Sequence, residues 1–250
     1  MKIGCIEYLN ALPFTLPFQL GEIPTTHQFI FAGPTEISSL FQKNILEAGL
    51  TSVTTSFEKG YYTTPSLGIA ADKEILSVNL YTRAPKESLT GKTIGLTSQS
   101  STSISLLQVL AYFFWKQEPL FTALDRTVPL SAYDAFLLIG DEALQHPSFP
   151  EYETIDLATE WHSLTGHPFV FATWIFHSPN PSFEEELETA LTWSEENLPT
   201  VVEEAHRRSH LSRELLFHYY SLCRYRLGEE EKLGLQKFKK YYDQIHALCA

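Results

Sequence analysis

Four consecutive hydroxyl side chains are the clearest candidate for binding an anion. They follow residues 92–96, which predict a strand, and precede residues 104–115, which predict an apolar helix. The amino end of a helix has unpaired N–H groups and a partial charge of roughly +0.5, so it can hold a carboxylate or phosphate without Lys or Arg. The alternative is that one hydroxyl only caps the helix, as Ser and Thr commonly do. The four residues are Ser100, Ser101, Thr102 and Ser103.

A second candidate is an asparagine that follows the first predicted strand. Residues 2–6 are apolar and predict a buried strand, and Tyr8-Leu9-Asn10-x-x-Pro13 comes directly after it. Open α/β sheets bind ligands at the carboxyl ends of their strands, and an amide offers both a donor and an acceptor. Asn10 therefore either contacts a ligand or caps a turn before Pro13.

Three other side chains have the chemistry of acids or bases. Asp141 and Glu142 are adjacent, so they rarely address the same atom, and the alternative places Asp141 as a helix cap with Glu142 in solvent. An unperturbed histidine has a pKa of about 6.5, so His167 could act as a base, whereas a turn histidine more often faces solvent.

Composition excludes several classes of function. The net charge of −12 over 250 residues argues against a nucleic-acid partner. No apolar run approaches the roughly 20 residues of a membrane helix, so we expect no membrane span. The motifs of nucleophilic hydrolases, P-loops, dinucleotide folds and zinc proteases are absent, and Cys5, Cys223 and Cys249 lack zinc spacing. We therefore expect neither a cofactor nor a metal.

The order of the predicted elements indicates how these groups are positioned. Strands alternate with helices up to about residue 176, and helices alone follow. This order predicts an α/β fold with two lobes and a crevice between them. We expect residues 1–84 plus 176–250 to form the first lobe, covered by the terminal helices, and residues 85–175 to form the second. Scattered cysteines, and a strand that starts at Lys2 with no room for a signal peptide, favour the cytoplasm.

Six short motifs occur in a fixed order over residues 1–174. Each is weak alone, and the order makes the set specific. With these motifs the sequence resembles the chorismate dehydratase family of the futalosine route to menaquinone. The motifs are Tyr8-Leu9-Asn10-x-x-Pro13, Ser77-Val78-x-Leu80-Tyr81-x-Arg83-x-Pro85, Ser100-x-Thr102-Ser103, Leu138-Ile139-Gly140-Asp141-Glu142-Ala143-Leu144, Asp156-Leu157-x-x-x-Trp161 and Thr165-Gly166-x-Pro168-Phe169-Val170-Phe171-Ala172-x-Trp174.

The resemblance implies a fold like type 2 periplasmic binding proteins, with a central cleft, and a lyase that removes water from chorismate. It implies 3-[(1-carboxyvinyl)oxy]benzoate as the product, a catalytic role for Asn10, and a hydroxyl turn that holds a substrate carboxylate. The residues expected on the substrate are Ser52, Ser77, Ser100, Ser101, Thr102, Ser103, Asp141, Pro168 and Phe169.

The chain departs from the family's usual residues at Glu47, Leu50, Ser101 and His167. Two alternatives stay open from the sequence. One is a non-catalytic binding protein for a small anionic solute, although we find no secretion signal. The other is a sister enzyme acting later in the same pathway, whose usual Pro-Cys-Pro-Asn opening fits Tyr8-Leu9-Asn10 poorly.

Overall fold

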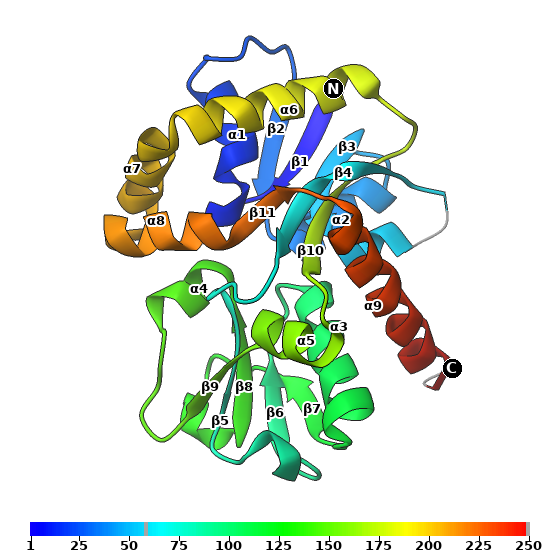
Figure 1. Cartoon of the computed structure of the whole chain (residues 1–250), viewed down its shortest axis with the longest axis vertical. Coiled ribbons are helices and arrows are strands. Elements are labelled where there is room, and N and C mark those ends of the chain that lie inside the picture. The colour runs from blue at the N-terminus through cyan, green and yellow to red at the C-terminus, as the bar shows by residue number, and fades with distance from the viewer. Residues whose placement is uncertain (58–59, 249–250) are drawn as a thin grey trace. The chain divides into compact units, whose positions relative to one another are not determined.

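Apolar runs along the chain form the strands of two separate sheets (Figure 1). The computed structural model describes residues 1–57 and 60–248. Contacts divide the chain into unit 1, which is Met1–Ala70 with Val170–Gly228, and unit 2, which is Ala71–Phe169 with Glu229–Ala250. The expectation of a two-sheet α/β fold is confirmed. The division differs from the expected lobes of residues 1–84 plus 176–250 and residues 85–175.

The sheet of unit 1 has the strand order β11-β4-β10-β3-β1-β2. Strand β1 runs parallel to β2 and β3, and β10 runs antiparallel to β3. Every residue of β3 and β10 is buried, as expected for central strands covered on both faces. The strands are β1 (Lys2–Ile6), β2 (Gln28–Ala32), β3 (Ala48–Ser52), β4 (Tyr62–Ala71), β10 (Phe169–Phe176) and β11 (Cys223–Arg226).

Helices of unit 1 come from both ends of its sequence. Helix α1 packs along α6 and α7, so the start of the chain is covered by helices from its second half (Figure 1). The helices are η1 (Leu9–Ala11), α1 (Leu12–Gln19), α2 (Pro34–Gln42), η2 (Val53–Phe57), α6 (Pro181–Glu196), α7 (Leu198–Ser209) and α8 (Arg213–Leu222).

Helix α1 was not expected, because two prolines suggested a chain that leaves the sheet without regular structure. Pro13 lies in the first helical turn, where a missing N–H costs nothing. Pro17 lies inside the helix, and residues 12–18 are all buried. Burial of this apolar segment therefore outweighs the local preference of proline.

The sheet of unit 2 has the order β7-β6-β8-β5-β9. Strand β6 is parallel to β7 and β8, whereas β5 is antiparallel to β8 and β9. The elements are β5 (Val78–Thr82), η3 (Lys86–Ser88), β6 (Thr93–Leu96), α3 (Ser101–Val109), the π-helical η4 (Leu110–Trp115), β7 (Leu120–Ala123), η5 (Leu130–Ala132), β8 (Ala135–Ile139), α4 (Gly140–Gln145), β9 (Glu153–Asp156), α5 (Leu157–Thr165) and α9 (Glu229–Leu248).

The final helix corrects the expectation that all the terminal helices cover the first lobe. Helix α9 packs against α3 of unit 2. Phe238 makes edge-on ring contacts with Trp161 and Phe169 at centroid distances of 6.0 and 4.8 Å. Gly234 lies so close to the rest of unit 2 that a Cβ would stand 2.1 Å from the carbonyl oxygen of Pro168. Aromatic packing and a close backbone approach thus hold α9 to unit 2.

Candidate active site

In unit 2, strand direction brings three of the expected site regions to one edge of the sheet. The parallel strands β6 and β8 end there, and the antiparallel β5 begins there. Val78 pairs with Ile139, and the Gly140 N–H donates to the Ser77 carbonyl at 2.7 Å. Ser77, the hydroxyl turn after β6 and Asp141 after β8 therefore share this edge.

The hydroxyl turn begins α3, and its members differ in exposure. The Ser103 N–H donates to Ser100 Oγ at 3.2 Å, so Ser100 is the N-cap of α3, as the alternative proposed. Thr102 and Ser103 are 0% and 2% exposed, whereas Ser101 is exposed. Ser100 therefore has a structural task besides any contact with a ligand.

A partly buried carboxylate holds the chain just before Ser77. Asp156 Oδ2 accepts the N–H groups of Ile75 and Leu76 at 2.9 and 2.8 Å. Its Oδ1 accepts those of Ala158 and Thr159 at 2.8 and 3.0 Å, which caps α5. Burial raises the pKa of Asp156, and the four N–H donors oppose that rise. From the sequence, Asp156 was named only as part of a motif and not as a support of Ser77, although an Asp before a helix is a common cap signal.

Two of the three side chains considered as acids or bases lie against a charged partner. Glu142 makes a two-pronged ion pair with Arg126, so the expectation that it is simply solvated is wrong. Asp141 lies in the first turn of α4, whose N-cap is Ile139, so Asp141 is not the cap itself. His167 Nδ1 lies 3.6 Å from a carboxylate oxygen of Glu230 in α9.

The side chains of Pro168 and Phe169 belong to the core of unit 2. The Trp161 indole N–H donates to the Pro168 carbonyl at 3.2 Å. Phe169 is 1% exposed, and its ring packs edge-on against Trp161 at 5.4 Å. Any contact of Phe169 with a ligand would therefore use its backbone.

In unit 1, Asn10 and Ser52 lie at the edge where the parallel strands β1 and β3 end. Ser52 is 4% exposed and pairs with Ala172 of β10. The amide oxygen of Asn10 is buried and has no hydrogen-bond partner among the described residues. A buried polar atom without a partner is uncommon, and a ligand or a water molecule can satisfy it.

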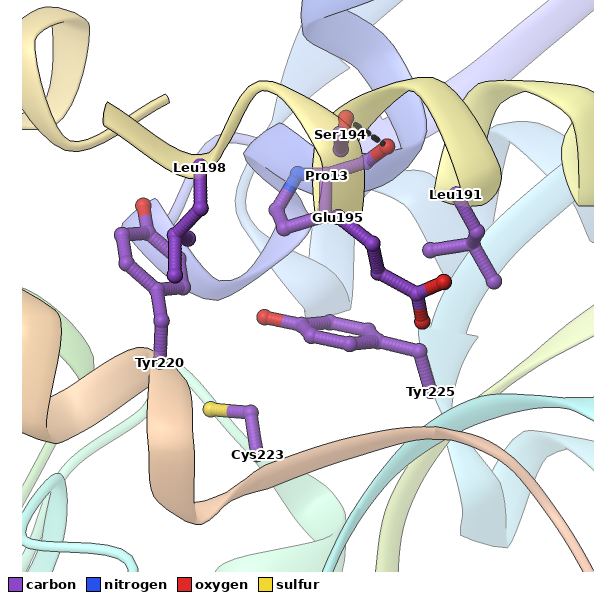
Figure 2. Close-up of a pocket in the computed structure, with 8 residues that line it drawn as sticks. All are labelled: Pro13, Leu191, Ser194, Glu195, Leu198, Tyr220, Cys223 and Tyr225. Carbon is purple, nitrogen blue, oxygen red and sulfur yellow. Dashed lines mark hydrogen bonds between the residues drawn. The ribbon is translucent and has the colours of Figure 1, made fainter. Parts of the chain in front are cut away.

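A cavity of about 190 Å³ lies beside Pro13, within unit 1 (Figure 2). Across it, the Tyr220 hydroxyl donates to the Leu9 carbonyl at 2.8 Å, and Ser194 Oγ donates to the Pro13 carbonyl at 2.9 Å. Both hydroxyls were missed from the sequence, because no local pattern links residues so far apart. The cavity is lined by Pro13, Leu191, Ser194, Glu195, Leu198, Tyr220, Cys223 and Tyr225.

Burial makes the two described cysteines poor nucleophiles. It raises the pKa of Cys223 to about 12 and also raises that of Cys5, so both stay as thiols near neutral pH. Cys249 lies outside the described residues.

Over residues 1–57 and 60–248, no three His, Cys, Asp or Glu side chains gather in a way that could hold a metal ion. In the same part of the chain, no helix is both long and apolar enough to cross a membrane.

The two sheets, with ligand-type side chains at strand ends, define a chain of the binding-protein-like fold class. A protein from Archaeoglobus fulgidus superposes with a TM-score of 0.79 at 16% identity, covering 98% of this chain and 97% of that one. The alkanesulfonate-binding protein SsuA from Xanthomonas axonopodis pv. citri gives a TM-score of 0.66 at 12% identity, covering 99% of this chain and 92% of that one. At these identities the likeness concerns the fold alone.

Within that class, the chain belongs to the menaquinone biosynthesis family, whose model matches residues 1–244. The chorismate dehydratase of Thermus thermophilus is 30% identical over 263 residues, covering 94% of this chain and 93% of the relative. The resemblance indicated by the six motifs is thereby confirmed.

Proposed function

We propose that this protein is a chorismate dehydratase that converts chorismate to 3-[(1-carboxyvinyl)oxy]benzoate and water. The observation that carries the proposal is the similarity, along nearly the whole chain, to the chorismate dehydratase of Thermus thermophilus. Membership of the menaquinone biosynthesis family supports a biosynthetic role. We expect a lyase that works in the cytoplasm on a small molecule, without a cofactor.

The proposed reaction removes a proton from C3 of the substrate ring and hydroxide from C4. The electron pair of the C3–H bond forms the new ring double bond as the C4–O bond breaks. The departing hydroxide takes up one proton and leaves as water. Because the ring becomes aromatic, the driving force lies in the substrate, and the protein must chiefly orient it.

The proposal assigns contacts with the substrate to residues of each unit. The partnerless amide oxygen of Asn10 would accept a hydrogen bond from the reacting end of the substrate. The amino end of α3, with Ser101, Thr102 and Ser103, would hold a carboxylate. The further contacts proposed are Ser52, Ser77, Ser100, Asp141 and the backbone of Pro168 and Phe169.

We propose the enolpyruvyl carboxylate of chorismate itself as the base for the C3 proton. The rival bases of this chain are Asp141 and His167, and His167 already faces the Glu230 carboxylate at 3.6 Å. A substrate-borne base needs only to be positioned, which suits a site rich in amide and hydroxyl groups.

The test is to mix purified protein with chorismate and to identify the product by mass. Loss of one water with formation of the meta-substituted benzoate supports the proposal. Tight binding of chorismate without any turnover would instead favour the solute-binding alternative.

A second measurement tests the role of Asn10. Asn10→Leu keeps the approximate shape and removes the amide, so kcat should fall about 100-fold. Asn197→Leu is the control, because its amide nitrogen only donates to the Trp193 carbonyl in its own helical region. Near-normal kcat in Asn10→Leu would contradict the role given to Asn10.

A further inference from the structure

The segment that carries Asn10 lacks two of the backbone donors that a helix normally has. In an α-helix each N–H donates to the carbonyl four residues earlier, and proline has no N–H. Pro13 comes four residues after Leu9, and Pro17 comes four residues after Pro13. The carbonyls of Leu9 and Pro13 therefore lose their usual helical donors. Leu9 keeps a shorter-range bond from the Leu12 N–H.

Two buried hydroxyls from later helices supply these carbonyls with donors. Tyr220 of α8 donates to Leu9, and Ser194 of α6 donates to Pro13, at 2.8 and 2.9 Å. Tyr220 is 5% exposed and Ser194 is 2% exposed, so both bonds are shielded from bulk solvent. Each hydroxyl thus replaces one donor that a proline removes.

Tyr220 and Ser194 both line the cavity of about 190 Å³, so this side of the segment is not filled by packed side chains (Figure 2). On this side the two hydroxyl bonds therefore fix the segment at separate points, one on each side of Asn10 in the sequence.

We propose that Tyr220 and Ser194 are positioning residues that set the place of Asn10 for the reaction. This inference rests on the proposed function. Tyr220 acts on the Leu9 carbonyl, which belongs to the same rigid peptide plane as the Asn10 nitrogen. The amide oxygen of Asn10 has no hydrogen bond of its own within the described residues, so its location follows its backbone. Misplacement of a catalytic group by about 1 Å can cost a large part of the rate.

The first experiment compares two tyrosines that line the same cavity. Tyr220→Phe removes the hydroxyl that binds Leu9, and kcat with chorismate should fall about tenfold while KM changes less than threefold. Tyr225→Phe is the matched control, because its buried hydroxyl bonds no backbone carbonyl of the segment, and its kcat should stay within twofold of wild type.

Ser194→Ala should lower kcat about fivefold. Its control is Ser209→Ala, whose hydroxyl donates to the Ala205 carbonyl and accepts the Leu211 N–H but binds no carbonyl of the Asn10 segment.

The second experiment separates positioning from general weakening of the fold. In an Asn10→Leu background, Tyr220→Phe should cost no further kcat, because the group it positions is already gone. Hydrogen exchange of residues 9–16 should be faster in Tyr220→Phe and unchanged in Tyr225→Phe. Equal kcat in the two tyrosine variants, or a full tenfold loss in the Asn10→Leu background, would overturn the proposal.

The outcomes also separate this inference from the proposed function. A wild-type protein that removes no water from chorismate refutes the function, whereas the exchange rates still report whether the hydroxyls hold the segment. Normal turnover by Asn10→Leu leaves chorismate dehydration standing and overturns the positioning role.

Discussion

The two candidate ligand-binding regions are built in opposite ways. In unit 2 the hydroxyl turn is organised by its own neighbours, since Ser100 Oγ accepts the N–H of Ser103, three residues later. In unit 1 the Asn10 segment depends on Tyr220 and Ser194, which lie 211 and 181 residues from the carbonyls they bind. A locally organised site should tolerate changes elsewhere in the chain. A site held from a distance links activity to the packing of α6 and α8.

The largest expected effect tests a part of the unit 2 edge that does depend on a distant residue. Asp156→Ala leaves the N–H groups of Ile75 and Leu76 without acceptors and uncaps α5. The free energy of unfolding should fall by about 3 kcal/mol, measured by urea denaturation. Asp125→Ala is the matched control, because this exposed Asp caps only the Thr127 turn, and stability should change little. Equal losses of stability in Asp156→Ala and Asp125→Ala would show that the position of the Asp156 carboxylate within the fold adds nothing to its stabilising effect.

The next prediction concerns the prolines of unit 1. Ser194→Ala leaves the Pro13 carbonyl without its donor and should destabilise the protein by about 2 kcal/mol. Pro17→Ala supplies an N–H four residues after Pro13, so the same serine change should cost less than half as much in that background. Pro199→Ala is the control, because Pro199 lies in the first turn of α7 and blocks no such bond. Thermal or urea unfolding of the two single variants and the double variant measures these losses. If the losses of stability from Ser194→Ala and Pro17→Ala simply add in the double variant, the explanation is contradicted.

This contrast also explains which features could be predicted from the sequence. The strands over residues 2–6 and 92–96 were predicted, because their apolar runs are locally decisive, and the structure has strands at Lys2–Ile6 and Thr93–Leu96. Helix α1 was missed, since Pro13 and Pro17 oppose a helix locally and only tertiary burial stabilises it. Strands β7 and β9 were missed because they are short and partly exposed.

Within the candidate site, the residues at strand ends were predictable and their supports were not. Asn10 and the hydroxyl turn follow recognisable strands, so their placement at sheet edges was correctly expected. Tyr220 and Ser194 lie on amphipathic helices, where nothing in the sequence distinguishes their hydroxyls from others. Their function depends on which carbonyls the fold brings to them.

A smaller effect separates capping from ligand binding at Ser100. Ser100→Ala should destabilise the protein by about 1 kcal/mol, whereas Ser100→Gly should cost only a few tenths, because glycine is tolerated at an N-cap. If the hydroxyl also binds a substrate carboxylate, both variants should raise the KM for chorismate about equally. A KM that rises only in the less stable variant would leave Ser100 with the capping role alone.

The smallest effect concerns pH and belongs to the wall of the unit 1 cavity. Burial raises the pKa of Cys223 from 9.0 to about 12, so the folded state binds the thiol proton more tightly than the unfolded state. This contribution is fully present below pH 9 and is lost as pH rises from 9 towards 12. Between pH 7 and pH 9.5 it should lower the free energy of unfolding by about 0.8 kcal/mol.

Cys223→Ala isolates this contribution, because any packing loss is the same at both pH values and cancels in the difference. Urea unfolding at pH 7 and pH 9.5 should therefore give a smaller pH-dependent loss in the variant, by about 0.8 kcal/mol. The buried Cys5 keeps its own raised pKa in both proteins, so its contribution cancels as well. Identical pH dependence in wild type and variant would mean that water reaches the Cys223 thiol. The cavity beside the Asn10 segment would then be wet, and water could compete with Tyr220 for the Leu9 carbonyl, which weakens the case for a segment held from a distance.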